Sequence, residues 1–403
     1  MRLPVTVRRE EPKAGQRILV TSDIHGHRKH LKALLEMADF GENDLLVVVG
    51  DLLEKGGDSL GTLRELMALE AAGRAMVVMG NVDFWRITYW DELEEAVRAA
   101  EETTDAIESL RAKRLAMEYA HRLWEEILSL GKTYGSSFFG ELLEELGLHP
   151  KGFAELMHAV PAVARAFAPE LAFLRTRPTV LETPRYRFVH GGLRQPALSE
   201  NLQLDAYSLM KYDWFARSAR EKGWVMEKYT VVGHWPVALN CSAYADSAPR
   251  MDTDTGIVSI DGGCGVMLDG QLNLLILPDA YAPVESATHL FYDEFPTMTV
   301  TRDQEGSDSS LYVHWHDDTV RFIRTEEDMA YVEHIRTGHR LWVPADYLYG
   351  IPEESRIPGA EGGCRDISDY RLPLRAGDTV RVVKTTSHGI IAKKGSVTGW
   401  VMA

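Results

Sequence analysis

Cysteine is scarce in this sequence, and its three residues, Cys241, Cys264 and Cys364, lie far apart. An odd number without a C-x-x-C pair argues against a disulfide framework and indicates a reducing compartment. Long apolar runs are also lacking, since none approaches the ~20 residues that a membrane-spanning helix needs. Residues 1–17 contain no apolar segment of a secretory signal. We therefore expect a cytoplasmic protein without a membrane partner.

Positive charge is in short supply as well. The 44 lysine and arginine residues face 60 aspartate and glutamate residues, and the formal net charge is −16. Such a chain repels the backbone of DNA or RNA, so we expect no nucleic-acid partner. The rest of the composition is that of a globular protein, and 403 residues leave room for two to four domains.

The N-terminal part of the chain alternates between strand-like and helix-like patterns. Strands are expected at 17–21, 45–49 and 75–79, and amphipathic helices at 31–37 and 59–70. Continuous apolar strands in this order are typical of a parallel sheet that is covered on both faces. Ligands of such sheets bind at the carboxyl ends of the strands. The sequence therefore predicts an α/β domain with a site at that edge.

Polar, glycine-flanked clusters stand where these strands end and where two later apolar segments end. The clusters are SDIHG at 22–26, GDLLEKG at 50–56, GNVD at 80–83, HGG at 190–192 and GH at 233–234. Carboxylate, amide and imidazole groups are together suited to divalent metal ions. We hypothesise that the five clusters meet at one edge of the sheet and form a metal site.

Residues 86–178 differ from the alternating pattern. Apolar side chains recur there at helical spacing among many Glu, Arg and Ala residues. This predicts one or two long helices followed by shorter ones. The segment is either a packing element or a functional cap over the site.

The five clusters, in their order and spacing over residues 17–277, resemble those of the calcineurin-like metallophosphoesterases. The phosphoprotein phosphatase branch of that family is marked by G-D-x-H-G, G-D-x-x-D-R-G, G-N-H-D/E, H-G-G and a later histidine. The dinucleoside tetraphosphatases of the branch are similar too, in GDL at 50–52 and GDS at 57–59. The resemblance implies a four-layer αββα sandwich over residues 1–283, with the helical insertion at about 86–178.

A dinuclear metal centre is also implied by this resemblance. The implied ligands are Asp23, His25 and Asp51 for one divalent ion, and Asp51, Asn81, His190 and His234 for the other. Manganese is the first expectation for both ions, with iron, zinc or magnesium as alternatives. A water between two such ions loses its proton near neutral pH and attacks phosphorus in line.

The position of the general acid departs from the pattern of the branch. Val82 stands where the branch has a histidine that protonates the leaving oxygen, and Asp83 remains as a catalytic candidate without that partner. Candidate replacements for the histidine are His27, His121 and His158. Loss of a general acid costs ~10²–10⁴ in rate, and alkyl esters suffer most because an alkoxide is a poor leaving group.

The phosphate-binding position departs as well. Lys55 stands where the branch has an arginine, and it offers a point charge instead of a planar fork. Arg194 is a candidate for a second phosphate contact, with a plain surface residue as the alternative. Glu54 replaces an aspartate of the motif, and we expect it to orient a histidine.

The chain beyond Pro278 shows short alternating strands and a repeat. DTVR at 318–321 recurs sixty positions later at 378–381. The stretches 342–348 and 374–401 resemble parts of SH3 barrels. We therefore expect a linker at 284–305 and two SH3-like modules, at 306–350 and 351–403. The modules would bind a peptide or another part of this chain, or else their aromatic residues, Trp315, Trp342, Tyr347 and Trp400, only fill barrel cores.

Three functions follow from these observations. The first is a dinuclear metal-dependent phosphatase that hydrolyses phosphate monoesters, with phosphoproteins or phosphopeptides as substrates. The alternative is a pyrophosphohydrolase of the bis(5'-nucleosyl)-tetraphosphatase type, because its leaving groups need no acid. A catalytically weak scaffold is the third, although every metal-ligand position is filled.

Overall fold

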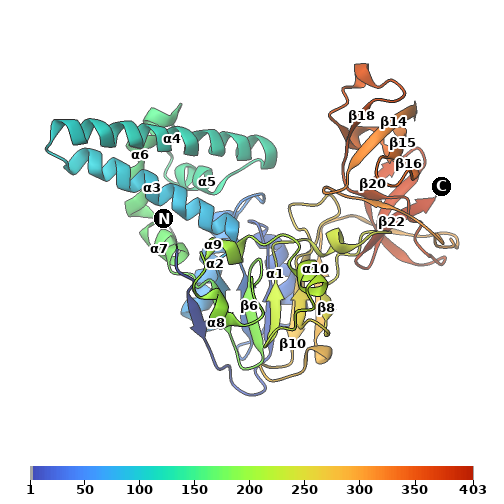
Figure 1. Cartoon of the computed structure of the whole chain (residues 1–403), viewed down its shortest axis with the longest axis horizontal. Coiled ribbons are helices and arrows are strands. Elements are labelled where there is room, and N and C mark those ends of the chain that lie inside the picture. Colours follow the sequence, from blue (N-terminus) through green and yellow to red (C-terminus); the bar gives the residue numbers. More distant parts are fainter. Residues whose placement is uncertain (1–2, 403) are drawn as a thin grey trace. The chain divides into compact units, whose positions relative to one another are not determined.

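Two compact units make up the chain in the computed structural model, which describes residues 3–402 apart from the side chain of Glu354 (Figure 1). The first unit comprises Met1–Trp235, Arg250–Gly265 and Leu272–Leu290, and the second comprises Pro236–Pro249, Val266–Gln271 and Phe291–Ala403. Among the helices described, none is long and apolar enough to cross a membrane.

Two mixed sheets form the centre of the first unit. One has the order β1 (Val7–Arg9), β5 (Val180–Glu182), β6 (Tyr186–Val189), β7 (Tyr229–Val232), β9 (Ile257–Ser259) and β8 (Arg250–Asp252). The other has the order β11 (Thr288–Tyr292), β10 (Leu272–Leu277), β2 (Ile18–Thr21), β3 (Leu45–Val49) and β4 (Ala75–Val78). Strands β2, β3 and β4 are parallel neighbours, as their continuous apolar sequences indicate.

The two sheets pack face to face and are covered on their outer faces. One buried cluster combines Val20 and Val47 of the second sheet with Phe188 and Val231 of the first. The helices α1 (Arg28–Met37) and α2 (Ser59–Ala71) bury leucines against the second sheet. The short helices α8 (Leu198–Asn201), α9 (Tyr207–Met210) and α10 (Phe215–Glu221) pack against the first sheet. The predicted four-layer αββα sandwich is thereby confirmed.

Five helices separate β4 from β5. They are α3 (Asn81–Glu102), α4 (Ala106–Tyr134), α5 (Phe138–Glu145), α6 (Phe153–Ala166) and α7 (Ala168–Arg175). The insertion begins before the expected residue 86, because α3 starts inside the third polar cluster. Asp83 accepts a hydrogen bond from Gly80 N and so caps the first turn of α3, at a place where the sequence indicated only a turn.

The second unit is all-β. One sheet has the order β16 (Arg340–Pro344), β15 (Met329–His334), β14 (Thr319–Glu326), β18 (Glu361–Cys364) and β17 (Leu348–Tyr349). The other has the order β12 (Thr297–Thr299), β20 (Thr379–Thr386), β21 (Gly389–Lys394) and β22 (Val397–Met402). A pair of short strands, β13 (Tyr312–Val313) and β19 (Ile367–Ser368), completes the unit.

The sixty-residue sequence repeat corresponds to a repeated hairpin. Strands β20 and β21 begin and end sixty positions after β14 and β15. The hairpins also share an irregularity in register, between Phe322 and Arg324 in one and between Val382 and Lys384 in the other. Trp400 and Tyr347 are buried in an apolar cluster, as expected of aromatic residues that fill a core.

The segment expected to be a linker, 284–305, is structured. It contains a 3₁₀ turn, η2 (Val284–Ser286), and the strands β11 and β12, and β12 pairs with β20. Its prolines only mark the turns between these elements. Residues 236–249 and 266–271, placed in the first domain on sequence, pack instead with the second unit, because sequence proximity does not report long-range contacts.

A buried lysine provides a test of the second unit. Lys393 Nζ is fully buried and lies 3.1 Å from Asp293 Oδ2 and 2.8 Å from Gln271 Oε1. We expect Lys393→Met to lower the free energy of unfolding by about 3 kcal/mol or more, because the buried carboxylate of Asp293 then keeps only Arg381 as a cationic partner. Guanidinium denaturation would measure this. The ion pair between the partly buried Lys384 and the exposed Asp346 supplies the control, since Lys384→Met should cost less than about 1 kcal/mol. Equal losses in the two variants would refute the expectation.

Candidate metal centre

The polar clusters lie where their strands end, on sharply turned backbone. Asp23, His25, Asp51 and His234 all have φ between 50° and 65°, in the left-handed region that residues other than glycine seldom adopt. Asp23 N donates to Gly50 O, and His25 N donates to Asp51 O, both at 3.0 Å, so the loops after β2 and β3 brace each other. Strained backbone of this kind clusters at functional sites, where it aims side chains.

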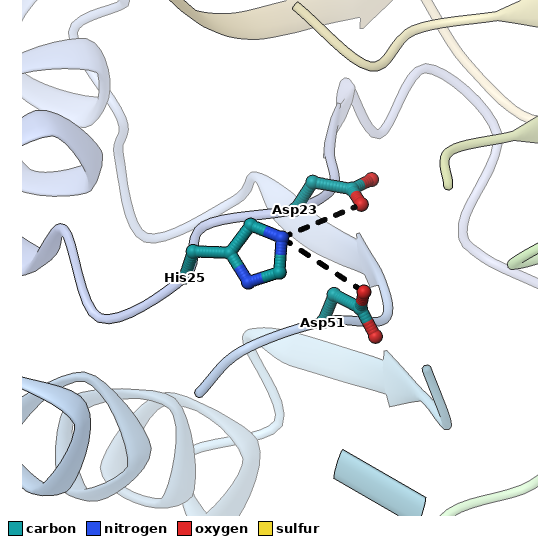
Figure 2. Close-up of side chains that lie close together, drawn as sticks. All are labelled: Asp23, His25 and Asp51. Carbon is teal, nitrogen blue, oxygen red and sulfur yellow. Dashed lines mark ion pairs between the residues drawn. The ribbon is translucent and has the colours of Figure 1, made fainter. Parts of the chain in front are cut away.

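Three buried side chains from these loops form the first ligand group (Figure 2). His25 Nε2 lies 4.0 Å from Asp23 Oδ1 and 3.9 Å from Asp51 Oδ2. His25 Nδ1 lies 3.0 Å from Leu53 O. A carbonyl oxygen only accepts, so Nδ1 carries the proton and the Nε2 lone pair faces the carboxylates. The three groups can hold one cation.

A second group shares Asp51 with the first. His190 Nδ1 donates to Val49 O at 2.7 Å, and its Nε2 lies 3.3 Å from Asp51 Oδ2 and 3.1 Å from Asn81 Oδ1. The ring of His234 lies 5.3 Å from the ring of His190, and its backbone N donates to Asp23 Oδ2. The structure thus gathers all six candidate ligands, and one Asp51 oxygen faces both His25 and His190.

The electrostatics of this group call for positive charge. Burial and the neighbouring Asp51 raise the pKa of Asp23 to about 6, against the effect of His190. Burial and the charge of Asp23 also raise the pKa of Asp261 well above its usual value. The charges of Asp51 and Asp23 overcome burial and raise the pKa of His190 to about 10. Buried carboxylates of this kind either take up protons or are compensated by a cation, so a cation bound here would keep them charged.

Lys55 already brings one positive charge to the group. Its Nζ lies 2.9 Å from His25 Nε2, on the lone pair that the carboxylates surround. Burial and this ammonium lower the pKa of His25 to about 3. The Lys55 ammonium therefore occupies the place where the carboxylate and imidazole groups could bind a metal cation. Donors of this chemistry fit a divalent metal ion.

The helical insertion holds the loop that carries Lys55. Arg86 Nε lies 2.9 Å from Glu54 Oε1, and Phe138 N donates to Glu54 Oε2 at 3.0 Å. Ser136 Oγ donates to Gly56 O at 3.0 Å. Glu54 was expected to orient a histidine, and this is wrong: its carboxylate joins the loop to the insertion, where burial raises its pKa to about 7.

Asp83 and Arg194 are engaged by backbone. The Oδ1 atom of Asp83 accepts from Leu52 N at 2.9 Å and from Leu53 N at 3.2 Å, and its Oδ2 accepts from Gly80 N. Arg194 donates to Ser208 O and Lys211 O, both at 2.9 Å. Both side chains shape the loops around the ligands in this structure.

The histidines proposed to replace the missing acid lie in different surroundings. His27 Nδ1 lies 2.9 Å from His25 O, which assigns it the proton and leaves Nε2 as an acceptor in the neutral ring. His121 packs against Phe153 within the insertion, with ring centroids 5.2 Å apart, and His158 is exposed.

Sequence reasoning missed three residues near the ligands. Asp213 Oδ1 lies 2.8 Å from His234 Nε2, and Lys211 Nζ lies 2.7 Å from Asp213 Oδ1 and 3.4 Å from His234 Nε2. Nothing in the sequence marks this loop, since it follows no strand. The buried Asp261 follows β9 and precedes two glycines, a pattern that could have identified it.

A sandwich of two mixed sheets with carboxylate, amide and imidazole donors at its strand ends defines a metal-dependent phosphoesterase. The comparison with family models agrees, since residues 16–251 match the calcineurin-like phosphoesterase model. The chain belongs to this family and is a hydrolase of phosphate esters. The family uses a dinuclear centre of divalent metal ions.

The curated relatives match this chain over different shares of their own length. A symmetrical bis(5'-nucleosyl)-tetraphosphatase of Legionella pneumophila (strain Lens) is 29% identical over 275 residues, which cover 64% of this chain and 92% of the relative. A protein of the same description from Aeromonas hydrophila is 35% identical over 107 residues, or 24% of this chain and 38% of the relative. Among solved structures, a protein serine/threonine phosphatase from Saccharomyces cerevisiae matches 73% of this chain and 85% of its own, at 11% identity and a TM-score of 0.39.

Removal of the shared carboxylate should weaken metal binding at the centre. We expect Asp51→Asn to lower the metal content of the purified protein by at least one ion per chain, because a neutral amide replaces the charge that both histidines face. Elemental analysis after dialysis would measure this. Asp254→Asn changes an exposed carboxylate and should leave the content unchanged. An unaltered metal content in Asp51→Asn would contradict the assignment.

Proposed function

We propose that this protein hydrolyses the phosphoanhydride chain of dinucleoside polyphosphates at a centre of two divalent metal ions, with manganese as the first candidate. One ion would be held by Asp23, His25 and Asp51. The other would be held by Asp51, Asn81, His190 and His234. When bound, such ions supply a deprotonated water and neutralise charge on the phosphoryl oxygens. The curated relatives, named as symmetrical bis(5'-nucleosyl)-tetraphosphatases, support this substrate class.

The observation that carries the proposal is the lack of a proton donor at residues 82 and 83. The side chain of Val82 has no proton to give, and both oxygens of Asp83 accept hydrogen bonds from backbone. Burial and the charge of Asp51 raise the pKa of Asp83 to about 7, but this proton lies within a scaffold of backbone amides. These two residues therefore do not act as the general acid.

A substrate with a stable leaving anion suits this arrangement. In a dinucleoside tetraphosphate, water attacks an inner phosphorus, the bond to the bridging oxygen breaks, and a nucleoside diphosphate leaves as an anion. This anion needs no proton at the moment of departure, whereas the alkoxide from a phosphoserine does. Phosphate monoesters, and phosphoproteins among them, are the alternative substrates, and they would require another acid.

Two lysines bring ammonium groups to the centre, and that of Lys211 is paired with Asp213 at 2.7 Å. Lys55 Nζ lies beside His25 Nε2, and Lys211 Nζ lies beside His234 Nε2. The two ammonium groups are therefore next to different candidate ligands of the centre. A chain of several phosphates carries more charge than one monoester and can contact both groups. Point charges suit such a chain, because they do not demand one orientation of each phosphate.

The substrate preference can be tested directly. We expect the manganese-loaded protein to hydrolyse diadenosine tetraphosphate faster than a phosphoserine peptide, by at least the ~10²-fold that a missing general acid costs. Chromatography of nucleotides and a phosphate-release assay would measure the two rates. Two molecules of ADP are expected as the products, in line with symmetrical cleavage. Faster hydrolysis of the peptide would overturn the proposal in favour of a phosphomonoesterase.

The role of Lys55 can be tested in the same assay. We expect Lys55→Gln to lower kcat/KM for diadenosine tetraphosphate roughly 10- to 100-fold, because hydrogen bonds to charged groups contribute about 1.5–3 kcal/mol. Lys32→Gln removes an exposed lysine of α1 and serves as the matched control. If both variants keep the wild-type kcat/KM, Lys55 does not contact the substrate.

A further inference from the structure

Helix α3 carries an aromatic stripe, formed by Trp85 and Tyr89, that extends away from the candidate metal centre. Asn81 stands at its first turn, with its Oδ1 atom 3.1 Å from His190 Nε2. Trp85 and Tyr89 follow at intervals of four residues, so the three side chains lie on one face of the helix. Four residues of helix rise ~6 Å, which places Trp85 one turn above the ligand Asn81.

Trp85 is exposed, and yet its orientation is fixed. Its side chain is 36% exposed, and its Nε1 donates to the hydroxyl of Tyr207 at 2.8 Å. The rings of Tyr207 and Tyr89 lie 5.2 Å and 5.3 Å from its ring. The exposed third of Trp85 is therefore held in one orientation near the centre, so a ligand that stacks on it need not order this side chain.

Packing of α9 against α3 does not account for this exposure. The neighbouring Phe84 supplies the apolar contact there, in a cluster with Met79, Ala206 and Met210. Trp85 instead contributes a hydrogen bond and a ring edge to Tyr207. Its remaining surface is available to a flat apolar partner.

We propose that Trp85, supported by Tyr207, is the platform on which a nucleobase of the substrate stacks while the phosphates occupy the metal centre; this rests on the function proposed above. A nucleotide carries its base one ribose away from the phosphates, and the platform lies one helical turn away from a ligand. Bases stack well on aromatic side chains, and stacking tolerates different bases. The platform thus selects nucleotides over other phosphoanhydrides without selecting adenine.

A substrate without a base isolates the contribution of the platform. Inorganic tripolyphosphate contains phosphoanhydride bonds and no aromatic ring. We expect Trp85→Ala to lower kcat/KM for diadenosine tetraphosphate about 5- to 100-fold, chiefly through KM, because stacking on an aromatic side chain contributes that much per base. The value for tripolyphosphate should change less than twofold. Diguanosine tetraphosphate should suffer as much as the adenosine compound.

Two conservative variants separate stacking from folding. Trp85→Phe keeps an aromatic face and should restore most of the loss, and Tyr207→Phe removes only the hydrogen bond to Trp85. Trp315→Ala removes an exposed tryptophan of the second unit and should leave both substrates unaffected. Equal losses for both substrates in Trp85→Ala would show a structural role and overturn the platform. Failure of the wild-type protein to hydrolyse any dinucleoside polyphosphate would instead refute the proposed function.

Discussion

The candidate metal centre depends on the carboxylate of Asp51, which its two ligand groups share. This carboxylate is buried at the end of β3, on backbone with a positive φ, and one of its oxygens faces histidines from two separate loops. A carboxylate in this position is costly unless positive charge surrounds it. The charge of His190 and the other nearby cations hold the pKa of Asp51 below its usual value despite its burial. The fold keeps this buried carboxylate charged by placing histidine and lysine side chains around it.

The loop that follows Asp51 links the centre to the helical insertion. Glu54 and Gly56 bond to the insertion through Arg86, Phe138 and Ser136, while Lys55 between them faces His25. Helix α3 itself begins with the candidate ligand Asn81, so the insertion is continuous with the candidate centre and also contacts the loop that carries Lys55. We infer that the insertion does more than cover the sheet: it orients Lys55 and carries the aromatic stripe.

Much of this arrangement could be predicted from sequence because it is local. Each cluster of candidate ligands follows an apolar strand directly, and parallel strands deliver their carboxyl ends to one edge. Asp23, His25 and Asp51 could therefore be placed together before the fold was known. Lys211 and Asp213 could not, because their loop follows a short helix and reaches His234 only in the folded chain. Likewise, the ion pair between Glu54 and Arg86 could not be predicted, because helical periodicity does not say where a helix lies in the fold.

The sequence by itself determined the class of fold, the repeat of the second unit and the residue types gathered at the strand ends, because apolar periodicity and strand-end polarity are properties of short segments. Only the tertiary structure decided which candidate side chains face one another. It also decided that Asp83 and Arg194 form hydrogen bonds with the backbone instead. It also decided that β12 joins β20 instead of lying in a linker. Such outcomes depend on contacts between distant segments, and only the packed chain brings those segments together.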